Sequence, residues 1–273
     1  MIKIATIAGS DASGGAGLEA DLKTFAEYGL YGMAVVTVIA TMNPDSNWSH
    51  AVWPIEETIL RAQAETVFKG VKPDAVKSGM LGTEYAVELT REYVSKYCAH
   101  YVLDPVMVCK GAGEALNPEL NRSIAAKLVP LAQVVTPNLF EAEQLSGLKA
   151  VNSIETMKEA ARIIAGKGAR TVFIKGGSKL PNATSAIDIL FDGTSFETLE
   201  APLIKTSYTH GAGCTTAAAI ACALALGLSV PAAVESAKKF ISASLSQGFA
   251  LNQWVGPGNP SAWRQGFLSN GVQ

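Results

Sequence analysis

The sequence predicts an α/β fold with a mostly parallel central sheet, an antiparallel edge and helices on both faces. Short β-branched runs alternate with segments of helical period along the whole chain, a pattern typical of parallel strands joined by crossover helices. Asp192-Gly193 separates two further strand-like runs and favours a tight hairpin turn, which predicts the antiparallel edge. Hydrophobic residues make up 48% of the 273 residues, enough for a large core, and no linker interrupts them. We therefore expect a single domain over residues 1–273.

Each expected strand is a short run enriched in residues that suit a pleated sheet. The strands are expected at Ile2–Ala8, Val35–Ile39, Ala75–Ser78, Tyr101–Asp104, Val134–Thr136, Thr171–Lys175, Ala186–Phe191 and Ser195–Leu199. Ligands bind beyond the carboxyl ends of the strands in sheets of this kind. We therefore expect the chemistry in turn-rich loops, several of which follow these strands. The loops are Gly9–Gly15, Asn43–Trp48, Cys109–Glu114, Gly176–Ser185 and Val255–Pro260.

The expected helices carry apolar residues at helical spacing. They are Gly17–Tyr28, Glu56–Phe68, Glu84–Tyr97, Asn138–Leu145, Ile154–Gly166, Ala212–Leu226 and Pro231–Gly248. The most apolar window, Ala217–Leu228, is shorter than the roughly 20 residues that a membrane span needs. We interpret it as a buried helix.

Charge and cysteine usage exclude several classes of protein. The chain has 22 basic and 24 acidic residues and no basic stripe, which argues against nucleic acid as a partner. Met1–Ile4 runs straight into a strand pattern without the features of a signal peptide. The four cysteines have no metal-ligand spacing, so we interpret them as reduced thiols. We expect a cytoplasmic protein without membrane or nucleic-acid partners.

A glycine-rich turn, Thr209–Thr216, opens the Ala-rich helix and suits an anion. Its small residues Gly211 and Gly213 let backbone N–H groups approach a ligand, and the helix dipole then favours negative charge. A tight turn without a ligand is the alternative, and the chain has no P-loop motif. Cys214 stands at the helix start, where a thiol pKa is lowered, so it is a candidate thiolate, base or nucleophile. The alternative is an inert residue fitted against the helix packing.

Six motifs occur in one order along nearly the whole chain. They are Ala8–Gly17 with Ala20–Lys23, Lys77–Gly82, Asp104–Val108, Thr136–Ala142, Ile174–Gly177 and His210–Cys214. Together they resemble the vitamin-kinase branch of the ribokinase-like kinases, which comprises hydroxymethylpyrimidine kinases and their pyridoxal-kinase relatives. The resemblance implies a three-layer ribokinase-like fold, ATP and Mg²⁺ as cofactors, and a homodimer.

The resemblance also assigns the groups that handle ATP. Asp104 and Glu141 are oxygen ligands suited to Mg²⁺ or its water shell, although Glu141 in a first helical turn also complements the helix dipole. Lys175 is expected to neutralise the γ-phosphate, with a solvated strand-end lysine as the alternative. Further expected ATP-binding residues are Lys110, Asn138, Gly177, Lys179, Asp188, Gly211 and Gly213. Asn138 alone is also explained as a helix cap.

Cys214 marks a subclass within that family. Ordinary ribokinase-like members have an aspartate there as general base, whereas the vitamin-kinase branch shares the cysteine. A thiol is a weaker proton acceptor unless ionised, so positioning the acceptor hydroxyl and deprotonating it both remain open.

The acceptor-binding residues that the resemblance implies are Gly9, Asp11, Asp21, Met42, Met80 and Val106. The stretch around Met42 favours pyridoxal over a pyrimidine. Pyrimidine kinases usually carry a glutamine after the second strand, whereas Ala40–Asp45 contains none. Met42 and Met80 instead predict an apolar wall for a flat ring. His210 either contacts a ligand or stabilises the turn.

Cys109 is the second discriminator between the two acceptors. It lies in a glycine-flanked segment, residues 106–118, that we expect to form a lid over the acceptor. A thiol there can add reversibly to the aldehyde of pyridoxal, a group that hydroxymethylpyrimidine lacks. Lys110 beside it can lower the thiol pKa or contact the ATP phosphates. The alternative is that Cys109 is a small residue without chemistry. We expect a kinase for the 5′-hydroxymethyl group of pyridoxal, pyridoxine and pyridoxamine. The alternatives are a hydroxymethylpyrimidine kinase, a sugar or nucleoside kinase, and a non-catalytic vitamin-binding or regulatory protein.

Overall fold

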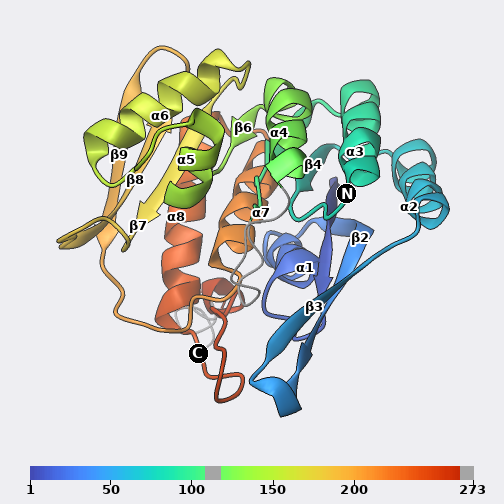
Figure 1. Ribbon diagram of the computed structural model, residues 1–273, viewed down its shortest axis with the longest axis horizontal. Helices are drawn as coiled ribbons and strands as arrows, with labels where there is room; N and C mark the ends of the chain where they lie inside the picture. Colours follow the sequence, from blue (N-terminus) through green and yellow to red (C-terminus); the bar gives the residue numbers. More distant parts are fainter. Residues whose placement is uncertain (108–117, 265–273) are drawn as a thin grey trace.

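Nine strands run through the computed structural model, which describes residues 1–107 and 118–264. They are β1 (Lys3–Asp11), β2 (Tyr31–Asn43), β3 (Ser49–Pro54), β4 (Ala75–Ser78), β5 (His100–Leu103), β6 (Val134–Val135), β7 (Val172–Gly177), β8 (Ser185–Phe191) and β9 (Phe196–Pro202). They form one sheet in the order β3-β2-β1-β4-β5-β6-β7-β8-β9 (Figure 1).

The middle of the sheet is parallel and both edges are antiparallel. From β2 to β7 every neighbouring pair is parallel. The β8–β9 hairpin closes one edge as predicted, and β3 pairs with β2 in the antiparallel sense at the other. The parallel strands all point the same way, so their carboxyl ends lie together at one end of the sheet, where ligands bind in such folds.

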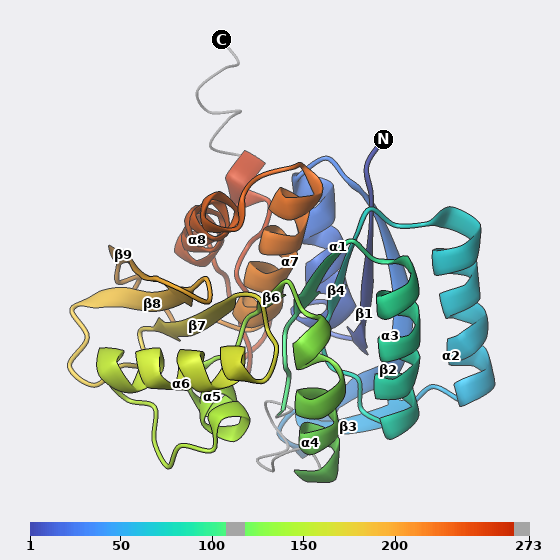
Figure 2. The same cartoon turned by 90° about the horizontal axis from the view of Figure 1, so that it is seen from above.

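Helices cover both faces of this sheet, so the predicted three-layer α/β fold is confirmed. The α-helices are α1 (Gly17–Glu27), α2 (Glu57–Ala64), α3 (Glu84–Tyr97), α4 (Pro118–Lys127), α5 (Leu139–Ser146), α6 (Ile154–Gly166), α7 (Ala212–Ala225) and α8 (Val230–Ser246). Figure 2 shows α1, α7 and α8 on one side and α2 to α6 on the other. Each side has its own apolar core against the sheet.

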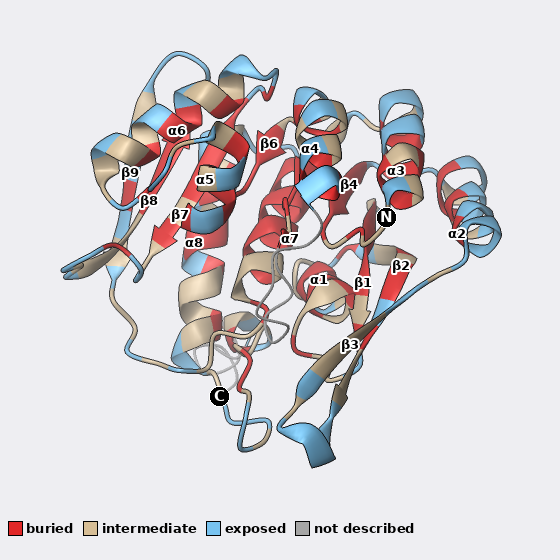
Figure 3. Ribbon diagram, viewed as in Figure 1, coloured by how far each residue is buried: buried red, intermediate tan, exposed pale blue. Residues whose placement is uncertain are grey.

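Helix α7 is deeply buried. Ten consecutive residues, Thr215–Leu224, are buried, and the alanines among them let α1 and α8 pack closely (Figure 3). The predicted buried helix is thus confirmed. Within the described ranges, no helix is long and apolar enough to cross a membrane.

Strand β3 and helix α4 were not predicted, and the expected loop Asn43–Trp48 connects the two strands of a hairpin. Strand β2 continues to Asn43, and Pro44–Ser46 forms a short 3₁₀ turn that leads into β3. Strand β3 escaped prediction because its residues are partly or fully exposed, so burial does not impose the usual alternation. Helix α4 was missed because only Leu120, Asn121 and Ile124 of it are buried, too short an apolar stripe.

Candidate active site

The glycine turn before α7 is a close contact between two helix starts. Gly211 has φ +76, and a Cβ there would lie 1.9 Å from the Gly15 carbonyl oxygen that precedes α1. A Cβ on Gly213 would lie 3.4 Å from Lys175 Nζ. Only glycine satisfies the first position, and at the second it leaves the space beside the ammonium open. The start of α7 thus lies beside a cation, the combination that an anion site requires, although the Ala212 N–H itself donates to the Thr209 carbonyl oxygen.

Lys175 belongs to this site and is held by Asp104. Its Nζ lies 2.8 Å from Asp104 Oδ1, which also accepts a hydrogen bond from Thr136. Burial alone would raise the pKa of Asp104, but Lys175 and Lys77 hold it below its ordinary value. Burial opposes the charge of Lys175, yet Asp104 and Glu141 raise its pKa. Both groups are therefore charged at neutral pH, and the alternative of a solvated strand-end lysine is wrong.

Glu141 and Asn138 form a reciprocal cap at the start of α5. The Asn138 side chain accepts from the Glu141 backbone N–H, and Glu141 Oε2 accepts from the Asn138 N–H at 2.8 Å. The cap that the sequence offered as an alternative role is therefore present. Burial, together with the nearby Asp104, raises the pKa of Glu141 to about 7.

The pair Asp104 and Glu141 fits a magnesium ion. Mg²⁺ takes one or two protein carboxylates and fills its remaining positions with water and phosphate oxygens. Asp104 raises the pKa of Glu141, a repulsion that a divalent cation relieves.

Cys214 is a protonated thiol, and the expected lowered pKa is corrected. Burial raises its pKa to about 11, although Lys77 and a hydrogen bond from the Gly17 backbone act in the opposite direction. The residue keeps some exposed surface. Enclosure by protein outweighs the helix N-terminus, so the thiolate is a minor species at neutral pH.

We expect Cys214 to react slowly with iodoacetamide. At pH 8 its alkylation should be about 100-fold slower than that of free N-acetylcysteine, and its rate should still rise above pH 10, because thiolate is the nucleophile. Mass spectrometry of the digested protein measures the modification at each cysteine. Cys222, fully buried in the same helix, is the control and should stay unmodified. Alkylation of Cys214 as fast as the reference thiol would contradict this assignment.

Asp11 and His210 tie the end of β1 to the glycine turn. His210 Nε2 lies 2.6 Å from Asp11 Oδ2, and the Asp11 carboxylate also accepts from the backbone N–H groups of Ser13 and Ala16. Burial alone would raise the pKa of Asp11, but these hydrogen bonds lower it to about 2. The turn-stabilising role of His210 is therefore present in the structure.

This network predicts a pH-dependent loss of stability. The pKa of Asp11 falls from 3.8 to about 2 on folding, which corresponds to about 2 kcal/mol. The contribution is complete above the unfolded pKa and is lost as the pH falls towards 2. In urea unfolding, Asp11→Asn should therefore be less stable than wild type by about 2 kcal/mol at pH 7 and by about half of that at pH 3. An unchanged difference at the two pH values would refute the assignment.

Asp21 is not on the surface of the site, contrary to its expected contact with substrate. Its side chain is 0% exposed, and Oδ2 accepts from Thr6 and from Lys77, whose Nζ lies 2.9 Å away. A Cβ on Gly79 would lie 2.8 Å from that Nζ, so glycine makes room for the ammonium at the end of β4. Lys77 had no expected role, although a lysine inside a short strand of a helix-covered parallel sheet was the available signal.

Two of the expected nucleotide residues shape the strand end after Lys175. Gly177 follows an irregularity in the register of β7 and has φ +50, and its N–H donates to Asp188 Oδ1. Asp188 Oδ2 lies 2.6 Å from Lys238 Nζ, so both carboxylate oxygens are engaged within the protein. Lys179 is exposed on the following loop and close enough to lower the pKa of Glu141 in part. Asp188 thus holds the backbone at Gly177, and the Lys179 side chain is exposed to solvent.

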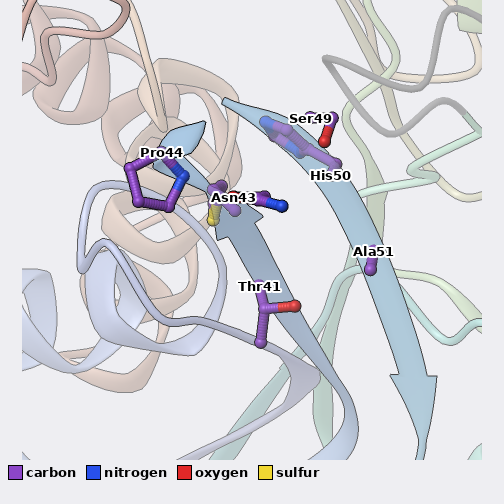
Figure 4. A pocket seen from close by; sticks show the side chains of 7 residues that line it. Thr41, Asn43, Pro44, Ser49, His50 and Ala51 are labelled. Atoms are coloured by element: carbon purple, nitrogen blue, oxygen red, sulfur yellow. The ribbon is translucent and has the colours of Figure 1, made fainter. Parts of the chain in front are cut away.

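Three of the expected acceptor residues, Gly9, Met42 and Met80, lie near the ends of β1 and β2. A Cβ on Gly9 would lie 2.7 Å from Val38 Cγ2 and 3.8 Å from Met80 Cβ, which brings β2 and Met80 over β1. Met42 and the hairpin turn line a hollow of about 420 Å³ (Figure 4). Val106 follows Asp104 closely and is partly exposed. Cys109 and Lys110 lie outside the described residues, as does the expected lid apart from residues 106, 107 and 118.

A family model described as phosphomethylpyrimidine kinase matches residues 11–259. The chain belongs to this family. A putative pyridoxine kinase of Treponema pallidum is 52% identical over 98% of this chain and 100% of the relative. The pyridoxine kinase of Bacillus subtilis is 49% identical over 97% of each chain, whereas the hydroxymethylpyrimidine/phosphomethylpyrimidine kinase of the same organism is 37% identical over 98% of each. The resemblance to the vitamin-kinase branch is therefore confirmed.

A solved structure shows the same fold with ligands. The Staphylococcus aureus pyridoxal kinase, in complex with AMP-PCP and pyridoxal, has a TM-score of 0.92 and 46% identity. The match covers 97% of this chain and 95% of that one.

Proposed function

We propose that this chain transfers the γ-phosphoryl group of ATP, with Mg²⁺, to the 5′-hydroxymethyl group of pyridoxal, pyridoxine or pyridoxamine. The observation that carries the proposal is the position of Lys175 Nζ, beside both Asp104 and the open space at Gly213. A charged ammonium lies there beside the start of α7, where N–H groups and the helix dipole favour an anion. This is the arrangement that phosphoryl transfer requires.

The side chains and backbone groups of the site have separate roles in this reaction. The N–H groups at the start of α7 and Lys175 bind and neutralise the transferred phosphoryl group. Asp104 and Glu141 would hold Mg²⁺, which neutralises phosphate charge when bound. Cys214, as a neutral thiol, positions the acceptor hydroxyl, because a loose transition state requires little proton removal before the phosphoryl group moves.

The acceptor end supports a B6 vitamer over a pyrimidine. Met42 and Met80 line this end, and Ala40–Asp45 offers no glutamine to an aminopyrimidine edge. An unpaired polar edge of that ligand would cost about 1–3 kcal/mol. The two pyridoxine kinase relatives are also more similar to this chain than the pyrimidine kinase of Bacillus subtilis is.

The proposal is tested by release of ADP from Mg·ATP with and without added acceptor. Pyridoxal and pyridoxine should each stimulate release, and EDTA should abolish it. Stimulation by sugars instead would indicate a sugar kinase. No stimulation by any B6 vitamer, pyrimidine or sugar would indicate a vitamin-binding protein without catalysis.

We further propose that the chain works as one domain, in a homodimer, in the cytoplasm. A single sheet unites the described strands, which supports the one domain.

Ile39 and Trp53 form an exposed cross-strand pair at the β3 edge and are a candidate contact between subunits. Cys98, Cys214 and Cys222 are free thiols, as a reducing compartment allows. Sedimentation of wild type and Trp53→Ser tests the dimer.

A further inference from the structure

Two stacked tryptophans join segments that are far apart in the sequence. Trp48 directly precedes β3, and Trp254 lies in the loop that follows α8. Their ring centroids are 5.3 Å apart and their planes are 15° from parallel. Figure 1 shows the turn of the β2–β3 hairpin and this loop side by side at the bottom of the view. The stack therefore ties the hairpin to the C-terminal part of the chain.

The hairpin tip, Asn43–Trp48, is an exposed part of the sheet. β3 is an edge strand, so its ladder with β2 secures it on one side only. Every residue from Asn43 to Asn47 is exposed, and Asn47 and Trp48 adopt positive φ. Segments with little buried surface open at a low cost in free energy. An aromatic stack is therefore an effective restraint on the position of this tip.

The loop that carries Trp254 is anchored to the glycine turn. The Gly256 carbonyl oxygen accepts a hydrogen bond from the His210 N–H. The Asn252 side chain accepts from the N–H groups of Trp254 and Val255, which fixes the backbone beside the indole. The imidazole of His210 is itself held at the end of β1. One ring of the stack is thus fixed relative to the turn before α7, and the other belongs to the hairpin tip.

The stack lies beside the acceptor end of the site. Both indoles line a hollow of about 380 Å³, together with Thr209 and His210 of the glycine turn. Met42, next to the first residue of the tip, lines the hollow of about 420 Å³ seen in Figure 4. His50 lines both hollows, so the two adjoin. A shift of the tip would therefore move Met42 relative to the glycine turn.

We propose that Trp48 and Trp254 are positioning residues that hold the β2–β3 hairpin, and with it the acceptor wall at Met42, in register with the phosphoryl-transfer turn. The inference rests on the proposed function, because it concerns the same acceptor end. Without the stack the tip occupies other positions as well, and acceptor affinity falls with the fraction of molecules that keep the competent one. A stacked aromatic pair favours one arrangement by about fivefold, which sets the size of the effect.

Trp254→Leu tests the inference, because it removes the stack and keeps an apolar side chain. Calorimetry without ATP should show pyridoxine binding weakened about fivefold. Steady-state kinetics should show a similar rise in the KM for pyridoxine, with kcat and the KM for ATP unchanged. Trp254→Phe keeps an aromatic ring and should recover most of the affinity. Trp263→Phe is the matched control, since Trp263 packs on Phe240 of α8, and it should behave as wild type.

Circular dichroism reports on the stack itself, independently of any acceptor. Two stacked indoles couple their ultraviolet transitions and give a pair of bands of opposite sign. These bands should be present in wild type and in Trp263→Phe. They should be absent from Trp254→Leu and from Trp48→Leu, and Trp48→Leu should show the same loss of pyridoxine affinity as Trp254→Leu.

Three outcomes would overturn the inference. The first is a wild-type spectrum without the paired bands. The second is pyridoxine binding by Trp254→Leu within about twofold of wild type although the bands are lost. The third is an equal rise in the KM for ATP, which would indicate a general distortion of the site. Failure of the proposed function is recognised separately, because wild type would then show the paired bands and bind pyridoxine without phosphorylating it, or would not bind it at all.

Discussion

Lys175→Met is expected to lower kcat about 10³-fold with a much smaller change in the KM for the acceptor. Lys175 Nζ lies beside Gly213 at the start of α7 and 2.8 Å from Asp104. Its charge is therefore placed to act on the transferred phosphoryl group, where charge stabilisation counts most. Steady-state kinetics with saturating Mg·ATP and pyridoxal measure the loss.

Folding must be separated from catalysis in this experiment. Removal of Lys175 leaves Asp104 buried without its ion-pair partner, which costs up to about 3–5 kcal/mol. Circular dichroism at the assay temperature shows whether the Lys175→Met protein is folded. Lys175→Arg keeps the charge and should retain more activity, and Lys239→Met removes an exposed lysine of α8 as a control. A folded Lys175→Met enzyme within tenfold of wild type would remove Lys175 from the phosphoryl-transfer site.

Gly211→Ala is expected to lower kcat/KM for ATP at least about 100-fold and to destabilise the protein by at least about 2 kcal/mol. The new Cβ would lie 1.9 Å from the Gly15 carbonyl oxygen, and φ +76 is unfavourable for alanine. The chain must move apart where α1 and α7 begin, and displacement of catalytic groups by about 1 Å costs roughly 100-fold. Kinetics and urea unfolding together measure both effects.

Gly227→Ala is the matched control at the opposite end of the same helix. Gly227 has φ +87, but nothing lies within 4 Å of its Cβ position. It should therefore lose about 1 kcal/mol of stability and keep wild-type kinetics. Equal kinetic losses in the two variants would show that backbone strain alone, and not the contact with Gly15, explains the effect of Gly211→Ala.

The sequence predicted the elements whose burial imposes a pattern. The parallel strands are short apolar runs covered on both faces, and α7 is an almost uninterrupted apolar helix, so both are visible in the order of residues. Strand β3 is exposed at an edge, and its pairing with β2 depends on a turn whose Asn47 and Trp48 adopt positive φ. Such a conformation is uncommon outside glycine and is not specified by the residue types.

The site was predictable in its residue types but not in its electrostatics. The motifs brought Lys175, Asp104 and Glu141 together, and the fold places them in contact or in electrostatic reach of one another. The pKa of Cys214 depends on how completely the chain encloses the thiol, a long-range property that a local helix-start pattern does not contain. For the same reason the burial of Asp21 against Lys77, 56 residues away, was not foreseen.

The most direct test offers the protein pyridoxal and hydroxymethylpyrimidine together. With equal concentrations of both and saturating Mg·ATP, the ratio of the two initial product rates equals the ratio of their kcat/KM values. We expect pyridoxal 5′-phosphate to be the main product, by at least about tenfold, because the pyrimidine edge lacks its glutamine partner. Equal rates, or a faster formation of hydroxymethylpyrimidine phosphate, would contradict the proposed preference for a B6 vitamer.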